Sequence, residues 1–265
     1  MNYMIWNSRG TRAQSFLALV RDLKSQYHLD FIAVLEIRCA KTASTGRASQ
    51  LGFSNMEIID CEGYSGGIYC LWEPSISHVT ILEQHHQYMH ILITGATGHT
   101  WTLTMVYGAP SCAGRRSLWE NLSRLVETVQ GAWMVGGDLN DTMLHCERRS
   151  SARSHTSYDR DLIRWVDSHD MRDVRFIGPE FTWKRGTSEA RLDRMLANEY
   201  WFNLFPNASV AHLPFFKFDH RPLLLRLDTK VDTSKPNRPF RFIAVWILHD
   251  KFDEFVKKSW AQEVT

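Results

Sequence analysis

The stretch GAWMVGGDLN (residues 131–140) holds the pattern from which the fold of this chain can be predicted. An apolar run at residues 133–135 ends in two glycines and is followed by a carboxylate and an amide. Such a run predicts a buried central strand that stops at the edge of its sheet. Residues just past that edge line the mouth of an α/β sheet, where binding sites tend to lie. Asp138 and Asn140 are therefore candidate site residues, although Gly, Asp and Asn are also favoured in ordinary turns.

Short apolar runs recur along the chain, and each ends in polar residues or glycine. They lie at residues 3–6, 30–35, 66–72, 78–82, 88–93, 101–107, 132–137, 181–184, 191–196 and 222–227. The four runs between residues 66 and 107 leave no room for helices between them. We therefore expect consecutive strands in this part of the chain to pair antiparallel.

Three other segments place apolar residues at helical spacing, at residues 16–23, 115–130 and 158–168. Strand runs with helices between them predict two sheets packed face to face and covered outside by helices. The expected fold class is therefore α/β (α+β), a four-layer sandwich of mainly antiparallel and mixed strands.

A boundary is expected near LDTKVDTSKPNRP (residues 227–239), which is polar and holds two prolines. We predict one domain over residues 1–228, followed by a linker and a helical tail over residues 229–265. Four apolar residues would share one face of a short final helix, with Asp250 as its N-cap: Phe252, Phe255, Val256 and Trp260.

The bulk composition is that of an ordinary globular protein, with 44% hydrophobic and 23% charged residues and a net charge of +2. That charge permits nucleic acid as a partner without demanding it. The five cysteines are scattered and lack a CxxC spacing, which argues against a disulfide framework and a structural zinc site. No stretch approaches the roughly 20 apolar residues that a membrane span needs, and the start is unlike a signal peptide. We expect an intracellular monomer, nuclear or cytoplasmic, with no membrane partner.

Polar side chains stand at the ends of several of the apolar runs. In addition to the opening pair these are Asn7, Glu36, Tyr107, Asp193, Asp219 and His220. Each has an ordinary alternative. Asn7 fits a turn, Glu36 a solvated helix cap, and His220 a satisfied core histidine, while Asp193 could form a surface ion pair with Arg191 or Arg194. Convergence on one cleft explains the whole set together.

Phosphoester hydrolysis is the chemistry that such a set supports. Mg²⁺ prefers oxygen ligands and takes only one or two protein carboxylates, and Glu36 can supply one. A histidine held by an aspartate stays protonated and can stabilise a pentavalent phosphorus. A second aspartate, braced by an amide, can orient or deprotonate the attacking water.

The series WNSRG, VLEIR, MVYGAP, GGDLN, ARLDRML and FDHRP, in this order, resembles the endonuclease/exonuclease/phosphatase superfamily. It is most similar to the endonuclease domain of plant LINE-type (non-LTR) retrotransposons, over residues 1 to 228. The tail looks like the connector that precedes their reverse transcriptase. The resemblance implies a DNase I-like two-sheet fold with Mg²⁺, or Mn²⁺, bound at one end.

The same resemblance implies a role for each motif residue. Glu36 would be the main metal ligand, with Asn7 and Asp219 beside it. Tyr107 would contact the phosphate or the leaving group. Asp138, supported by Asn140, would serve the water or the leaving group. Asp193 would orient His220, and Thr182 would help to hold this network.

The implied function is a metal-dependent phosphodiesterase, most specifically a DNA endonuclease that nicks one strand. Basic residues expected to contact DNA are Arg9, Arg148, Arg149, Lys184 and Arg185. The chain departs from the family pattern at Ile37 and Phe218, where the family usually has Thr and Ser. The alternative is therefore a decayed element fragment that binds nucleic acid without cleaving it. An inositol-phosphate or lipid phosphatase fits less well because of the tail.

Overall fold

The structure is a computed structural model that describes residues 1–39, 41–61, 66–76, 78–95, 98–149, 160–216 and 218–228. Met1–Thr229 forms one compact unit. The expected linker and final helix, at residues 229–265, lie outside the described residues. None of the helices among the described residues is long and apolar enough to cross a membrane.

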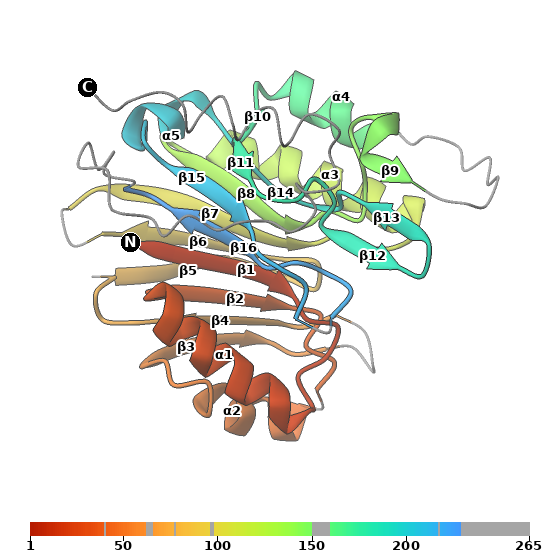
Figure 1. The fold of residues 1–265 in the computed structure, drawn as a ribbon. Coiled ribbons are helices and arrows are strands. Elements are labelled where there is room, and N and C mark those ends of the chain that lie inside the picture. Colours follow the sequence, from red (N-terminus) through yellow and green to blue (C-terminus); the bar gives the residue numbers. More distant parts are fainter. Residues whose placement is uncertain are drawn as a thin grey trace, which may run out of the picture. The chain divides into compact units, whose positions relative to one another are not determined.

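Two large sheets form the centre of the unit (Figure 1). The first sheet has seven strands in the order β11-β15-β16-β1-β2-β4-β3. Its strands are β11 (Phe176–Ile177), β15 (Ser209–His212), β16 (Leu223–Arg226), β1 (Asn2–Asn7), β2 (Phe31–Leu35), β4 (Ile68–Trp72) and β3 (Asn55–Ile59). The second sheet has six strands in the order β10-β14-β8-β7-β6-β5. Its strands are β10 (Arg172–Asp173), β14 (Asp193–Ala197), β8 (Trp133–Asp138), β7 (Thr100–Tyr107), β6 (Tyr88–Thr94) and β5 (His78–His85).

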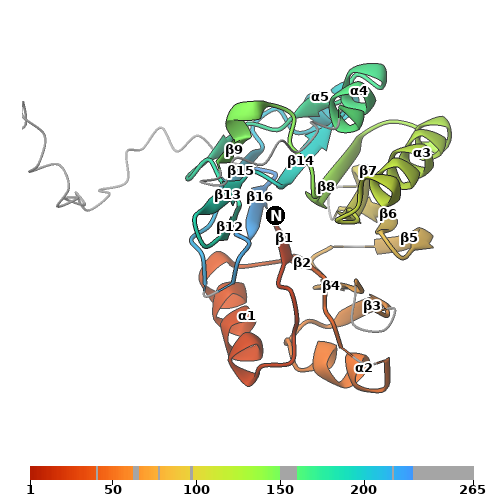
Figure 2. The same cartoon turned by 90° about the vertical axis from the view of Figure 1, so that its right-hand side faces the viewer.

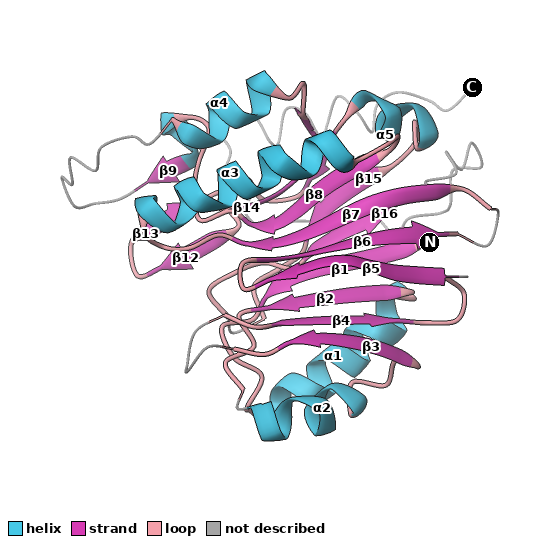
Figure 3. Ribbon diagram, turned by 180° about the vertical axis from the view of Figure 1, so that it is seen from behind, coloured by secondary structure: helices cyan, strands magenta, loops and turns pink. Residues whose placement is uncertain are grey.

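Helices cover the outer face of each sheet, which gives the four expected layers (Figures 2 and 3). The helices α1 (Gln14–Tyr27) and α2 (Lys41–Ser49) lie against the seven-stranded sheet, and α3 (Cys112–Thr128) and α4 (Asp161–Ser168) lie against the six-stranded sheet. A short helix, α5 (Glu199–Leu204), buries Trp201 in the core between the sheets. The predicted α/β sandwich is therefore confirmed.

Alternation along the strands explains why the layers form. In β1, Tyr3 and Ile5 point into the core between the two sheets, whereas Met4 and Trp6 pack under α1. In β8, Met134 belongs to the inner core, whereas Trp133 packs under α3 and α4. Both strands are thus buried on both faces, so their sequences are continuous apolar runs rather than alternating ones.

The Gly-Gly pair of the opening stretch is required by close packing at the end of β8. Gly137 has a φ of +139°, and a Cβ there would lie 2.2 Å from the carbonyl oxygen of Val106 on β7. A Cβ on Gly136 would lie 3.0 Å from the side chain of Ile5 on the opposite sheet. The glycines therefore extend the strand to its last residue, Asp138, instead of ending it early.

One predicted pairing was wrong. Strands β5, β6 and β7 do pair antiparallel in sequence, but β4 pairs with β2 and β3 and not with β5. The chain crosses from one sheet to the other after Trp72, and Ile76 in this connection is buried in the core between the sheets. A short connection thus changed layers where the sequence pattern suggested a hairpin.

A third, small sheet was not foreseen as a unit. It has the order β12-β13-β9, with β12 (Trp183–Arg185), β13 (Ser188–Ala190) and β9 (Arg148–Arg149). Its strand β9 directly follows the 3₁₀ turn η1 (His145–Glu147). A β-bridge between Trp183 and His220 joins this sheet to the segment that carries two of the predicted site residues.

Candidate active site

The strands bring the polar residues of both sheets to one edge. Strands β1 and β2 are parallel, with Asn7 opposite Leu35, so Asn7 and Glu36 leave their sheet together. Strands β7 and β8 are also parallel, with Tyr107 opposite Asp138. In Figure 1 the arrowheads of these four strands point towards the side on which β12 and β13 lie. The carboxyl ends of two parallel pairs, one from each sheet, therefore form the site.

Asp138 is the centre of the hydrogen-bond network, and its side chain is buried. Its Oδ2 accepts a bond of 2.7 Å from Asn7 Nδ2, which links the two sheets. Its Oδ1 accepts a bond of 2.9 Å from the backbone N–H of Asn140. The Asn140 amide in turn donates to the Gly108 carbonyl at 2.8 Å and to Asp138 Oδ2 at 3.3 Å. Asn140 thus fixes the carboxylate against the end of β7.

Asp193 and His220 meet, as predicted. His220 Nδ1 lies 2.9 Å from Asp193 Oδ2, and His220 Nε2 lies 3.8 Å from Asp138 Oδ2. Asp193 is the first residue of β14 and pairs with Asp138 across the ladder. The hydroxyl of Thr182 accepts bonds from the backbone N–H groups of Leu192 and Asp193, at 3.0 and 2.9 Å. Thr182 therefore holds the start of β14, which carries the aspartate.

The surface ion-pair interpretation of Asp193 was wrong. Asp193 is only 2% exposed. Its neighbours Arg191 and Arg194 bind other acids: Arg194 contacts Glu147 at 2.5 Å and Asp173 at 2.8 Å, and Arg191 contacts the same two acids at 3.3 and 2.8 Å. These four residues, of which Asp173 is half-buried and the others are buried, connect β14 to β10 and to the loop that follows Asp138. Asp193 therefore pairs with His220 and with neither arginine.

The electrostatics of the pair favour a protonated imidazole. Burial lowers the pKa of His220, but the carboxylates of Asp193 and Asp138 raise it by more, to about 9. Burial raises the pKa of Asp138, whereas His220 acts in the opposite direction. At neutral pH His220 therefore carries its positive charge, and Asp138 is a stronger base than an ordinary aspartate.

Glu36 is a buried carboxylate on the other side of the site. Its side chain is 4% exposed and contacts Arg38, and Glu36 Oε2 lies 3.7 Å from Arg9 Nε. Burial and the charge of Glu36 raise the pKa of Tyr107, so the phenol keeps its proton and can donate. The helix-cap alternative for Glu36 was wrong, because Glu36 directly follows β2.

Asp219 joins the cluster through Arg9, whose guanidinium contacts its carboxylate. The backbone N–H of Arg9 donates to Asn7 Oδ1 at 2.9 Å. The side-chain hydrogen bond to Asp219, together with the charges of Asp219 and Glu36, raises the pKa of the Arg9 guanidinium. The sequence pattern predicted a nucleic-acid contact for Arg9, and its place among the carboxylates was missed.

Backbone strain is concentrated at this site. Six non-glycine residues among those described have positive φ, and four of them are Arg9 (46°), Glu36 (55°), Arg38 (46°) and Asn140 (50°). Such residues cost free energy and persist where the surrounding structure holds them, commonly at functional sites. Glu36 is one of the site carboxylates, and the other three each lie two residues after a buried polar residue of the site: Asn7, Glu36 and Asp138.

Two groups of side chains are candidates for a divalent cation. Asp138, Asp193 and His220 lie close enough together for three ligand atoms. However, His220 Nδ1 and Asp193 Oδ2 are already bonded to each other at 2.9 Å, and Asp138 Oδ2 accepts a bond of 2.7 Å from Asn7 Nδ2. Glu36, Asp219 and the amide oxygen of Asn7 offer hard oxygen donors, which Mg²⁺ prefers. The ligand chemistry of the second group therefore suits a hard divalent cation.

The two departures from the family pattern both turn away from the charged network. Ile37 is fully buried and belongs to the core under α1. The Phe218 ring packs edge-on against Trp6, with ring centres 4.9 Å apart, and lies 6.0 Å from Phe16. The expectation that this ring points into the core is confirmed, so it does not crowd the carboxylates.

The other predicted DNA-contact residues lie on the small third sheet and are exposed. Arg148 and Arg149 form β9, and Lys184 and Arg185 lie in β12. The backbone N–H of Lys184 donates to the Asp219 carbonyl at 2.9 Å, which places β12 directly beside the cluster.

Three charged residues of the site region were missed: Arg38, Glu147 and Asp173. Arg38 follows Glu36 by two positions, and that spacing could have raised the question of a pair. Glu147 and Asp173 gave no signal, because their partners, Arg191 and Arg194, lie 18 to 47 residues away in the chain.

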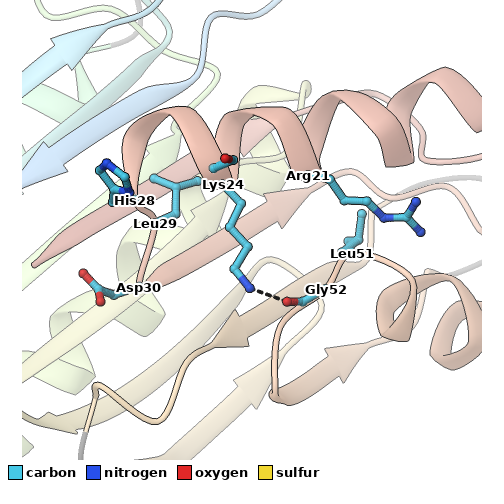
Figure 4. Close-up of a pocket in the computed structure, with 8 residues that line it drawn as sticks. Arg21, Lys24, His28, Leu29, Asp30, Leu51 and Gly52 are labelled. Atoms are coloured by element: carbon cyan, nitrogen blue, oxygen red, sulfur yellow. Dashed lines mark hydrogen bonds between the residues drawn. The ribbon is translucent and has the colours of Figure 1, made fainter.

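A cavity of about 490 Å³ lies elsewhere, at the end of α1 (Figure 4). Asp30, which lines it, precedes β2, whereas Glu36 follows β2, so the cavity is at the opposite end of that strand. The charges there are already engaged, because Lys24 contacts both Glu73 and the Gly52 carbonyl. This cavity is not part of the candidate active site.

Solved structures with the same fold include two endonucleases. The AP endonuclease LMAP from Leishmania major is 16% identical, with a TM-score of 0.68 over 84% of this chain and 86% of that one. The endonuclease domain of TRAS1, a telomere-specific non-LTR retrotransposon, is 12% identical, with a TM-score of 0.62 over 84% of this chain and 96% of that one. These likenesses show the fold, which is DNase I-like.

The chain belongs to the endonuclease/exonuclease/phosphatase family, whose model matches residues 4–214. A curated relative is the transposon TX1 uncharacterized 149 kDa protein of Xenopus laevis, 26% identical over 175 residues. That match covers 62% of this chain but only 13% of the relative. The family consists of hydrolytic nucleases and phosphatases that use divalent metals.

Proposed function

We propose that this chain is a Mg²⁺- or Mn²⁺-dependent DNA endonuclease that nicks one strand, as in LINE-type retrotransposition. The observation that carries the proposal is the buried pair of Asp193 and His220. The Nε2 atom of His220 lies 3.8 Å from Asp138 Oδ2. This arrangement places a positively charged donor, His220, beside a basic carboxylate, Asp138, in a fold shared with DNA nucleases. The transposon relative supports the retroelement assignment.

In this mechanism Asp138 takes the proton of the attacking water, because burial raises its pKa towards neutrality. The water oxygen forms a bond to phosphorus while the bond to the leaving oxygen breaks. The imidazolium of His220, held by Asp193, stabilises the charge on the phosphoryl oxygens. The Tyr107 hydroxyl donates to the phosphate or the leaving oxygen. Bound beside Glu36, Asn7 and Asp219, a divalent cation would offset charge on the scissile phosphate.

Nucleic acid would be held by the small sheet. Register places Arg148 and Trp183 on one face with Arg185, because Trp183 is opposite Ala190, which is opposite Arg148. Lys184 and Arg149 lie on the other face on either side of Glu189, and Lys184 contacts that carboxylate at 2.9 Å. The charges of Arg148 and Arg185 therefore support phosphate contacts better than those of Lys184 and Arg149.

The direct test is nicking of supercoiled plasmid by the full chain, with Mg²⁺ and with EDTA. We expect nicking only with the cation, and loss of nicking in Glu36→Ala. Nicking that persists in EDTA would contradict the metal-dependent mechanism.

The second candidate function is nucleic-acid binding without cleavage. It is favoured by Ile37 and Phe218, since both replace a hydroxyl that the family usually has with a side chain packed in the core. Salt-sensitive DNA binding without nicking under any divalent cation would support it over the endonuclease proposal.

A further inference from the structure

Arg9 contacts all three residues that the proposed function places on the metal side. Its backbone N–H bonds to Asn7, and its guanidinium contacts Asp219 and lies 3.7 Å from Glu36. Glu36 has Arg38 as a second cationic neighbour. Two guanidinium groups thus balance the acidic side of the site.

These arginines and a divalent cation need the same atoms. A metal ion binds carboxylate oxygens at close range through their lone pairs, and those of Glu36 and Asp219 face guanidinium groups here. Both arginines reach solvent, since the side chain of Arg9 is 31% exposed and that of Arg38 is 37% exposed, against 4% for Glu36. Water can therefore solvate a guanidinium that leaves the carboxylate, whereas Glu36 itself is buried.

We propose that Arg9 is a displaceable counter-ion. It neutralises Glu36 and Asp219 before a divalent cation binds and leaves them when one does, so that its guanidinium becomes available to a phosphate of the nucleic acid. Arginine suits this exchange because its planar fork matches carboxylate and phosphate equally well. Cation and phosphate then reinforce each other's binding, since linkage is reciprocal. This inference rests on the metal site of the proposed function.

The test uses the full chain without nucleic acid and needs no catalysis. The side-chain Nε–H signal of Arg9 is assigned by NMR from its loss in Arg9→Met, and Mg²⁺ is then titrated. We expect the signal to move to the position of a solvent-exposed arginine as Mg²⁺ binds. By calorimetry, Arg9→Met should bind Mg²⁺ roughly five- to tenfold more tightly than the natural chain.

Arg12→Met is the matched control, because it removes the same charge from the same loop. Tightening of the same size in Arg12→Met would reveal a general charge effect and overturn the proposal. An Arg9 signal that stays in place at saturating Mg²⁺ would also overturn it, and this measurement on the natural chain holds even if Arg9→Met folds poorly. If Mg²⁺ bound neither the natural chain nor Arg9→Met, both the metal site and the inference would be wrong. Release of Arg9 without any nicking would leave the inference standing and count against the endonuclease proposal.

Discussion

At the scale of single residues, the bond between Asp193 and His220 carries the mechanism. Asp193→Asn keeps the size and the backbone bond to Thr182 but removes the charge that keeps the imidazole protonated. We expect nicking to fall by roughly 10²- to 10⁴-fold, the usual contribution of a positioned acid–base group. The far-UV circular dichroism should stay native. An unchanged rate would mean that the pair is only structural.

Phe218 gives a second prediction at this scale, in which nicking activity rises while the stability of the fold falls. Phe218→Ser should raise nicking by roughly ten- to hundredfold, the value of one restored charge-assisted hydrogen bond. It should also lower the free energy of unfolding by about 1–3 kcal/mol, because the ring packs on Trp6 and Phe16. Phe218→Ala is the control, since it removes the same packing and adds no hydroxyl. Equal rates in the two variants would reject the hydroxyl argument.

At the scale of elements, the small sheet should contact DNA through one of its faces. Replacing Arg148 and Arg185 with Gln should make the negative slope of log K against log salt shallower by about 0.9 for each phosphate that is no longer neutralised. Replacing Arg149 and Lys184 in the same way should change the slope less, because acids already neutralise them: Glu180 lies 3.8 Å from Arg149, and Glu189 lies 2.9 Å from Lys184. Fluorescence anisotropy on duplex DNA at several salt concentrations measures both slopes. The reverse order would place the binding face on the other side of the sheet.

At the scale of the whole molecule, buried histidines make stability depend on pH. His90 is 2% exposed and its Nδ1 lies 2.7 Å from Thr104 Oγ1, and burial lowers its pKa to about 4. Because the unfolded chain takes up the proton first, stability falls as pH drops from about 6.5 to 4, by roughly 1–3 kcal/mol.

The histidine contribution can be isolated by substitution. Other buried groups titrate in the same range, so the prediction concerns the difference between the natural chain and His90→Gln, which keeps a polar group near Thr104. Urea unfolding at pH 7 and pH 4.5 should show a smaller drop in stability for the variant. Equal drops would mean that His90 accepts its proton in the folded state without cost.

The layers and the positions of most site residues could be predicted from local sequence alone. Apolar runs and helical spacing depend on neighbours within a few residues, so β1, β2, β7, β8, α1 and α3 could be read directly. Once those runs are taken as neighbouring parallel strands, Asn7 and Glu36 must lie at the same edge of one sheet, and Tyr107 and Asp138 at the same edge of the other. For the same reason, a polar residue at a strand end predicted the edge at which the site forms.

The choice of partners among these residues depends on contacts that are distant in the chain. The chain changes sheets after β4, with Ile76 of this connection buried between the layers, and the local sequence pattern does not predict the change. Asn7 meets Asp138 across 131 residues, and Arg9 meets Asp219 across 210. Arg191 and Arg194 flank Asp193 in sequence, yet they bind Glu147 and Asp173 instead. A charged side chain can form an ion pair with any opposite charge that packing brings within reach. The fold, and not spacing along the chain, therefore determines which residues pair.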